Sequence, residues 1–271
     1  MKINWFPGHM KKTMAEIKAK LSIVDVVIYL LDSRAPISSI NPSLSRLSQN
    51  KPVLYVFNKV DIADEGKVRE LAKAYKTENS DYVIMNSTLS GSSKIIRQKI
   101  ILLAKDKIEK FKRKGIKTVV RAIVVGVPNS GKSTLVNNLC GKSKAVTGNR
   151  AGVTKMTQWV SIGDNIEICD TPGTLYPNLE DQEVAKKLLF IGSIKDEVVA
   201  DNIDMAIELI STIEKLYPGL MQGRYGDDLS IEGIAKKRGF ILGRGEYDLD
   251  RAANAIIDDF RKCRIGKITL D

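Results

Sequence analysis

The chain has 271 residues, 43% of them hydrophobic, which allows one large domain or two of ordinary size around a buried core. No uncharged apolar run approaches the roughly 18 residues of a membrane span, and the N-terminus lacks the apolar core of a secretory signal. These features predict a soluble, cytoplasmic protein with no membrane partner. The three cysteines, Cys140, Cys169 and Cys263, fit neither a zinc pattern nor a disulfide framework.

The net charge of +11 is unevenly distributed. Residues 1–178 hold 29 Lys and Arg against 14 Asp and Glu, whereas residues 179–271 hold 14 against 18. A positive surplus of this size favours a polyanionic partner such as nucleic acid. The alternative is a thermophile-style surface rich in Lys and Glu, but such a surface predicts a balance of signs.

The first 140 residues alternate between helical and strand-like segments. Met10, Met14 and Ile17 recur at helical spacing, which predicts a short basic helix over residues 10–20. Apolar runs bounded by turn residues predict buried strands over 24–31, 52–57, 82–85 and 118–125. Helices are predicted over 42–47, 64–76, 91–113 and 131–140. In the helix over 91–113 the residues expected to face inward are Ile95, Ile96, Ile100, Leu103 and Ile108.

The predicted secondary structure changes after Pro177, from alternating strands and helices to helices alone. Before it, residues 156–162 and 166–169 predict a hairpin that turns at residues 163–165. After it, strand signals stop and helical periodicity runs over 184–190, 205–216, 231–237 and 249–260. The sequence therefore predicts an α/β domain with a doubly wound, mostly parallel sheet over 1–178, and an all-α domain over 179–271.

A phosphate-binding loop is predicted between the strand over 118–125 and the helix that follows. Gly126-Val-Pro-Asn-Ser-Gly-Lys-Ser133 fits G-x-x-x-x-G-K-[ST] at every fixed position. Its glycines let backbone N–H groups wrap around phosphate oxygens, and the helix adds its N-terminal dipole. Lys132 is expected to reach the β- and γ-phosphates, and the Ser133 hydroxyl to ligate Mg²⁺. The nucleotide-binding residues predicted here are Asn129, Ser130, Gly131, Lys132, Ser133 and Thr134.

Asp170-Thr-Pro-Gly173 follows about 40 residues later, where a second carboxylate on the Mg²⁺ side and a γ-phosphate-sensing glycine belong. Asp170 and Gly173 are the candidates for these two roles. Thr154 is the candidate switch threonine on Mg²⁺, with Thr157 as a weaker competitor. A plain loop threonine is the structural alternative for Thr154.

Asn58-Lys59-Val-Asp61 fits N-K-x-D, the string by which GTPases select guanine. The Asp61 carboxylate can accept both N–H donors of the guanine Watson–Crick edge. Adenine presents the wrong pattern, and an unpaired buried carboxylate makes mispairing costly. Asn86 and Ser87 end the next strand and are expected to approach the base from the other side.

The order of these motifs is unusual. An ordinary GTPase has its phosphate loop first and its guanine reader last, whereas this chain has the guanine reader first. Along the chain the order is guanine reader, base-backing loop, phosphate loop, switch threonine and D-x-x-G. This is the usual GTPase order if the ordinary chain is cut between D-x-x-G and the strand before the guanine reader, and its original ends are joined. The sequence therefore predicts a circularly permuted P-loop GTPase, because strand adjacency in space can survive permutation.

The whole chain closely resembles the circularly permuted GTPases of the YlqF/RbgA ribosome-biogenesis family. Besides the motif order, the resemblance is carried by the opening Trp5-Phe-Pro-Gly-His-Met10, by Asp32-Ser-Arg-Ala-Pro36 and by the helical C-terminal part. It implies a protein, expected to be monomeric, that binds GTP and GDP and contacts the rRNA of the large ribosomal subunit precursor. It also implies slow intrinsic GTP hydrolysis, stimulated by ribosomal particles late in assembly.

The resemblance also bears on catalysis. The residue after Gly173 is Thr174, where Ras-like proteins carry a water-orienting glutamine. The family resemblance assigns that role to His9, the only histidine; a structural or RNA-stacking histidine is the alternative. Asn129 resembles the loop asparagine that ligates K⁺ in some GTPases, and a small polar loop filler is its alternative.

Three basic clusters are candidate RNA contacts. They are residues 105–117, 236–239 and 261–264, and a solvated helix end is the alternative for each. Two other functions stay open at this stage. The protein could be a GTP-gated RNA-binding scaffold, or a permuted GTPase acting on the small subunit or another structured RNA.

Overall fold

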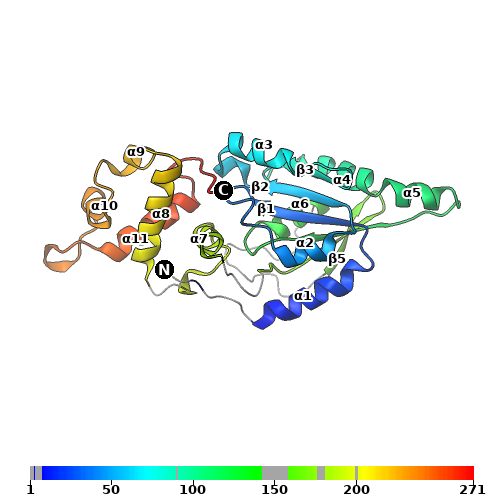
Figure 1. Ribbon diagram of the computed structural model, residues 1–271, viewed down its shortest axis with the longest axis horizontal. Helices are drawn as coiled ribbons and strands as arrows, with labels where there is room; N and C mark the ends of the chain where they lie inside the picture. Colours follow the sequence, from blue (N-terminus) through cyan, green and yellow to red (C-terminus); the bar gives the residue numbers. More distant parts are fainter. Residues whose placement is uncertain (1–2, 4–7, 90, 142–157, 176–180, 199–200) are drawn as a thin grey trace.

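The computed structural model of the protein describes residues 3, 8–89, 91–141, 158–175, 181–198 and 201–271. It has two halves, a sheet covered by helices and a group of helices formed by the rest of the chain (Figure 1). No helix within these residues is long and apolar enough to cross a membrane.

The sheet has six strands in the order β3-β2-β1-β4-β6-β5. Every neighbouring pair is parallel except β5 and β6, which form the predicted antiparallel hairpin. The strands are β1 (Val26–Asp32), β2 (Val53–Asn58), β3 (Ser80–Ile84), β4 (Val120–Val125), β5 (Gln158–Gly163) and β6 (Ile166–Asp170). The predicted α/β class and mostly parallel sheet are confirmed, and β1 lies between the guanine-reader strand and the phosphate-loop strand.

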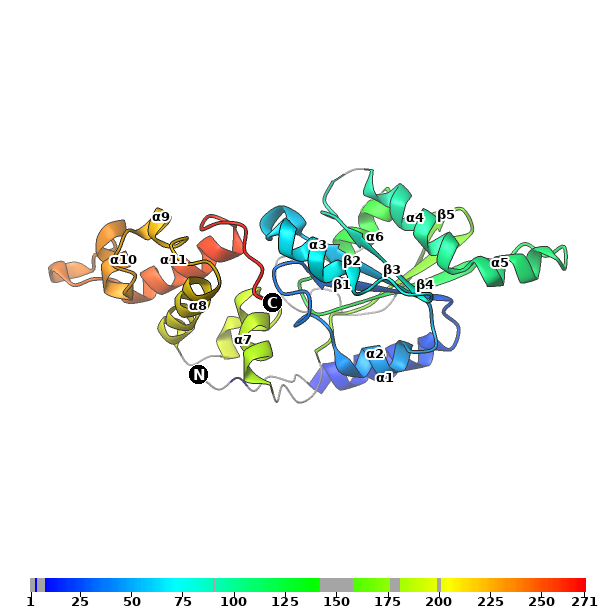
Figure 2. The same ribbon diagram turned by 45° about the horizontal axis from the view of Figure 1, so that its top comes forward.

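Helices cover both faces of this sheet (Figure 2). They are α1 (Gly8–Leu21), α2 (Pro42–Ser48), α3 (Glu65–Lys73), α4 (Ser92–Leu103) and α6 (Lys132–Cys140), with a 3₁₀ turn at Val60–Ile62. The helix α5 (Lys105–Lys112) follows α4, extends beyond the sheet and has no buried residues (Figure 1). Alternate residues of β1 enter different clusters, because successive side chains of a strand point to opposite faces. Ile28 packs with α4 and α6, whereas Tyr29 packs with α1, α2 and α3.

The prediction of a single helix over 91–113 is wrong. The chain forms α4 and α5, which meet at Ala104, and that residue is buried in the cluster beneath α4. Ile96 and Ile100 face the sheet as predicted, but Ile95 is 48% exposed. Ile95 lies one residue before the face defined by 96 and 100, so the helical rotation carries it towards solvent.

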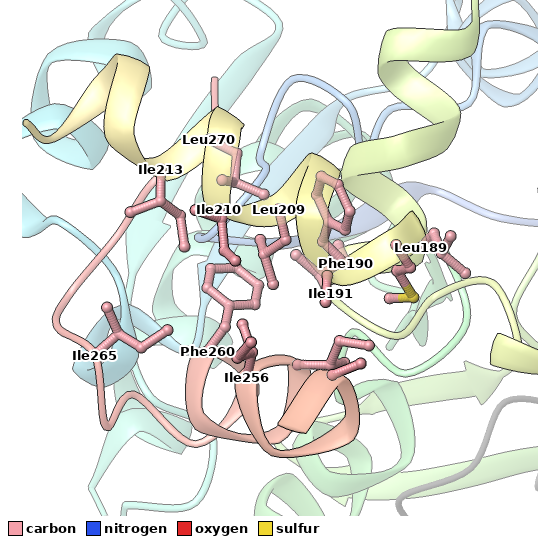
Figure 3. Packing of buried hydrophobic residues seen from close by; sticks show 14 of the residues in the cluster. Leu189, Phe190, Ile191, Leu209, Ile210, Ile213, Ile256, Phe260, Ile265 and Leu270 are labelled. Carbon is pink, nitrogen blue, oxygen red and sulfur yellow. The ribbon is translucent and has the colours of Figure 1, made fainter. Parts of the chain in front are cut away.

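The second half is helical, as predicted. Its helices are α7 (Gln182–Phe190), α8 (Asn202–Leu216), α9 (Gln222–Tyr225), α10 (Ile231–Arg238) and α11 (Leu249–Arg261), with 3₁₀ turns at Asp196–Val198 and Gly243–Gly245. The short α9 was not predicted. Four of the helices begin at a side chain that accepts a first-turn N–H, as N-caps do: Asp181, Asp201, Ser230 and Asp248. Figure 3 shows apolar side chains of α7, α8 and α11 packed into one cluster, which also includes residues of α10.

The two halves share buried contacts. The helical cluster also contains residues from the first half: Ile3, Met10, Ala35, Val127 and Leu175. The carboxyl terminus returns between the halves (Figures 1 and 2). There Leu270 N donates to Arg34 O at 2.7 Å, and the Asp271 carboxylate accepts from Ser38 N and Oγ. These contacts place helices of the second half against the carboxyl ends of the strands.

Candidate nucleotide-binding site

The phosphate loop joins β4 to α6, and close backbone approach requires glycine at two of its positions. A Cβ on Gly126 would lie 2.3 Å from Leu30 O, and one on Gly131 would lie 2.4 Å from Asn58 Nδ2. Both residues also have positive φ, 152° and 99°. The motif glycines therefore let the loop run against β1 and against the guanine-reader strand.

Asn58 ties three predicted elements together. Its Nδ2 donates to Ser130 O at 2.8 Å, and its Oδ1 accepts from Ser87 N at 2.9 Å. The carboxyl ends of β2, β3 and β4 therefore meet around one side chain, as in the ligand-binding crevice of an open α/β sheet. Asp61 follows in the 3₁₀ turn with an exposed side chain.

The loop after β3 carries Asn86 and Ser87, the two residues predicted to approach the base. Asn86 Oδ1 accepts from Thr88 N and Oγ1, so this side chain closes its own turn. Ser87 is buried, and its carbonyl accepts from Asn138 Nδ2 of α6 at 3.1 Å. Asn138 was missed at the sequence level, because an asparagine in a helix gives no signal of a contact with a distant loop.

A buried ion network supports the guanine reader. Lys59 has a left-handed φ of 63°, and its Nζ lies 2.8 Å from Asp32 Oδ2 and 2.5 Å from Asn129 O. Arg34 donates to both oxygens of Asp32, at 2.9 and 2.7 Å, in a fork. Burial alone would raise the pKa of Asp32, but Arg34 and Lys59 outweigh it and hold that pKa well below its usual range. The segment 32–36 was part of the family resemblance, yet its residues carried no predicted role.

Replacing Asp32 by Asn should lower the free energy of unfolding by about 3 kcal/mol, because Arg34 and Lys59 would lose the carboxylate that pairs them. The native pKa is depressed, so this contribution is fully present above the unfolded value of about 4 and is lost as the pH falls below it. Urea unfolding at pH 7 measures the effect. Glu65→Gln, which breaks an exposed ion pair with Arg69, should cost less than about 1 kcal/mol. Equal losses in the two variants would contradict a special role for the buried network.

Two of the residues predicted on the Mg²⁺ side, Ser133 and Asp170, lie together. Ser133 Oγ donates to Asp170 Oδ2 at 2.9 Å. Asp170 Oδ1 is buried without a hydrogen-bond partner in the described part of the chain, and burial raises the pKa of this carboxyl. A hydroxyl beside a buried, under-satisfied carboxylate is the oxygen donor set that Mg²⁺ prefers, so these residues fit the ion.

Lys132 is buried at the start of α6, 6% exposed. Its Nζ donates to Val127 O at 2.7 Å, across the loop that it belongs to. Burial lowers the pKa of this ammonium to about 8, although Asp170 opposes the shift. Lys132 is thus a desolvated cation at the point where phosphate would enter.

Gly173 packs against the phosphate loop. A Cβ there would lie 2.5 Å from Pro128 Cα, so only glycine allows the approach. Thr174 N donates to Gly126 O at 3.2 Å, and the Thr174 side chain is fully buried. The Thr174 hydroxyl is buried and has no hydrogen-bond partner among the described residues. Thr154 and the competing Thr157 lie outside the described residues, and for His9 the structure describes only the backbone, within α1.

These strands and loops define a class of protein: a P-loop GTPase whose guanine-reading strand precedes its phosphate loop in the chain. A family model described as 50S ribosome-binding GTPase matches residues 121–222, so N-K-x-D lies upstream of the match. Ribosome biogenesis GTPase A from Bacillus cereus is 38% identical, covering 100% of this chain and 94% of that protein. The protein of the same name from Thermotoga maritima is 30% identical over 99% of this chain and 94% of its own.

Solved structures agree with the sequence relatives. The crystal structure of GNP-bound YlqF from T. maritima matches with a TM-score of 0.68 and 26% identity, covering 96% of this chain and 97% of that one. Its GDP-bound structure matches with a TM-score of 0.64. The chain belongs to the ribosome biogenesis GTPase A family, the YlqF/RbgA family of permuted GTPases. It is a guanine-nucleotide-binding GTP hydrolase of ribosome assembly.

Proposed function

We propose that the protein acts on the large ribosomal subunit precursor in the cytoplasm, contacts its rRNA, and hydrolyses GTP slowly until the particle stimulates it. The observation that supports this most strongly is the match to a family model described as 50S ribosome-binding GTPase over residues 121–222. The positive surplus of residues 1–178 supports a polyanionic partner independently. We propose residues 1–178 as the GTPase domain and 179–271 as a helical domain, in a monomer.

The basic segment 105–117 is our first candidate for the rRNA contact. It includes α5, which projects from the sheet half at the end away from the helical half (Figures 1 and 2). Four of its cations are exposed and form no ion pair within the described residues: Lys110, Lys112, Lys114 and Lys117. Such side chains can neutralise phosphates without first breaking an internal pair.

The cluster over 261–264 is a weaker candidate, because its cations serve the fold. Arg261 pairs with Asp196, Lys262 with Asp258, and Arg264 with Asp258 and Asp259. The cluster over 236–239 stays a candidate, since Lys236 and Lys237 are exposed at the end of α10.

We propose that Ser133, Asp170 and Thr154 hold Mg²⁺ and that Asn129 ligates K⁺. Both ions would supply positive charge beside the phosphates during hydrolysis. Asn129 has a left-handed φ of 59°, and its carbonyl accepts from Lys59. Equal hydrolysis rates in potassium and sodium salts would remove K⁺ from the mechanism.

We propose His9 as the water-orienting residue. Subunit-stimulated turnover that survives His9→Ala would contradict that role.

Single-turnover GTP hydrolysis with purified ribosomal subunits tests the proposed function. Large subunits are expected to accelerate turnover, and small subunits are not. Replacing Lys110, Lys112, Lys114 and Lys117 by Ala should weaken association and make it less dependent on salt, while intrinsic hydrolysis stays unchanged.

A matched control replaces Arg69, Lys73, Lys99 and Lys186, which are already in ion pairs and lie outside the candidate clusters, and should retain association. Nucleotide-dependent binding to large subunits without acceleration would contradict the proposal and favour a GTP-gated scaffold. Acceleration by small subunits alone would move the target there.

A further inference from the structure

Two arginines from different parts of the chain hold the carboxyl end of α7. Arg261 of α11 donates to Phe190 O at 2.9 Å and to Leu189 O at 2.8 Å. Arg34, which follows β1, donates to Ile191 O at 3.0 Å. The last carbonyls of a helix lack intrahelical partners and carry the negative end of its dipole, so both guanidinium groups are favourably placed. The end of α7 is therefore a joint between the sheet half and the helical half.

Arg34 sits deep in this joint. It is 3% exposed, and its guanidinium lies 5.8 Å from the centroid of the Phe260 ring. Figure 3 shows Phe260 of α11 in the same cluster as Phe190 and Ile191 at the end of α7. Displacing α7 and α11 from the sheet would thus break a buried hydrogen bond and expose apolar surface at once.

A continuous line of polar contacts runs from this joint to the nucleotide site. Arg34 pairs with Asp32, Asp32 pairs with Lys59 at 2.8 Å, and Lys59 Nζ also lies 2.5 Å from Asn129 O. Asn129 belongs to the phosphate loop, and Lys59 belongs to the guanine reader. One buried carboxylate therefore joins the base-reading motif to the helical half.

A second link reaches the same loop by a separate route. Ser193 is 1% exposed, and its Oγ donates to Pro128 O at 2.8 Å. Gly192 has a φ of 78°, and a Cβ there would lie 3.4 Å from Asn129 Nδ2 and 3.6 Å from Arg261 Cζ. The segment 191–193 thus bonds to Pro128 of the phosphate loop and lies beside Asn129, from the side of the helical half.

We propose that Arg34 and Ser193 are positioning residues that hold the phosphate loop in its nucleotide-binding path by anchoring it to the helical half. Nucleotide affinity then depends on whether α7 and α11 are packed against the sheet half. By linkage, a bound nucleotide stabilises that packing by the same free energy. A macromolecule that pulls the helical half away would weaken GDP binding and promote release. The inference rests on the proposed nucleotide site and adds a coupling between that site and the helical half, through Lys59 and through the loop residue Pro128.

Nucleotide affinity tests this coupling in the full chain. Ser193→Ala should weaken fluorescent GDP binding about 3- to 10-fold, the effect of one lost buried hydrogen bond. Arg34→Met should weaken it more, on the order of 10- to 100-fold, since it loses the fork on Asp32 and the bond to Ile191. Arg34→Lys should fall between wild type and Met, because an ammonium keeps the charge but lacks the fork.

The double variant Ser193→Ala, Arg34→Met should lose less than the product of the single effects, because both residues act on one segment. Arg69→Met, which removes an exposed arginine of α3, is the matched control and should bind GDP as wild type does. If Arg34→Met does not fold, Ser193→Ala and Arg34→Lys carry the test. Variants that all bind GDP within twofold of wild type would overturn the inference.

Hydrogen exchange distinguishes this coupling from a purely structural role of Arg34 and Ser193, because only the coupling predicts that GDP changes amide exchange in the helical half. Saturating GDP should slow amide exchange over residues 182–194 in wild type, and this effect should shrink in the saturated Ser193→Ala and Arg34→Met variants. Unchanged exchange there in wild type would refute the coupling. No ribosomal particle enters either experiment, so their failure is distinct from failure of the proposed function. Wild-type protein that binds no GDP would overturn the nucleotide site itself and this inference with it.

Discussion

Replacing Lys132 by Met is expected to weaken GTP and GDP binding on the order of a thousandfold without lowering the stability of the nucleotide-free protein. Lys132 is 6% exposed and its ammonium donates to Val127 O, so the free protein bears the cost of burying a charge. Bound phosphates would accept charge-assisted hydrogen bonds from this ammonium, each worth about 1.5–3 kcal/mol, and these bonds would offset the cost. The methionine stem fills the same space but cannot form them.

Calorimetric titration with GDP and with a GTP analogue measures this loss, and thermal unfolding with and without nucleotide reports it independently. Lys73→Met removes an exposed lysine of α3 and should change neither quantity. Binding by Lys132→Met within threefold of wild type would contradict the assignment of the phosphate-binding lysine.

The same residue sets an expected pH dependence. Its native pKa of about 8 lies below the unfolded value of about 10.4, so between these values the unfolded chain holds a proton that the native state has lost. The contribution of Lys132 to the stability of the nucleotide-free protein therefore rises over this interval. Nucleotide affinity should fall as the pH rises above about 8, because phosphate needs the cationic form. The Lys132→Met variant should lack this fall in affinity, which distinguishes the titration of Lys132 from that of other groups.

Replacing Asp61 by Asn is expected to exchange guanine for xanthine selectivity. The carboxylate can accept from N1–H and from the 2-amino group of guanine. The asparagine amide would instead point a donor at that amino group. Xanthine carries a carbonyl at that position, so it can accept from the amide while N1–H donates to the amide oxygen. Mismatched polar groups of this kind discriminate by about 10⁴ or more.

The expected result is a loss of GTP affinity on the order of 10⁴-fold and a preference for xanthosine triphosphate, read by competition against a fluorescent guanine nucleotide. Asp61 is exposed on a 3₁₀ turn, so the variant should fold normally. Asp106→Asn on α5 is a charge-matched control that should keep guanine selectivity. Unchanged selectivity in Asp61→Asn would mean that another residue reads the base.

The fold class was predictable because its signals are local. Buried parallel strands appear as apolar runs, and three of the strands end at or just before a motif residue: Asn58, Gly126 and Asp170. The break of the predicted 91–113 helix at Ala104 was not predictable, since apolar spacing continues across it. Ile95 was misplaced for a related reason: periodicity gives a face to within about one residue, and packing on the sheet selects which flank is buried.

The sequence by itself determined the permuted order of the nucleotide motifs, because N-K-x-D and the phosphate loop are short strings whose chemistry depends on residues close together in the chain. Only the tertiary structure decided what those motifs rest on. Asp32 and Arg34 pair in the core, Asn138 supports the base loop, and Ser193 reaches Pro128 across 65 residues. Such contacts depend on where the strands and helices converge, and single polar residues far apart in the chain carry no pattern that announces their meeting.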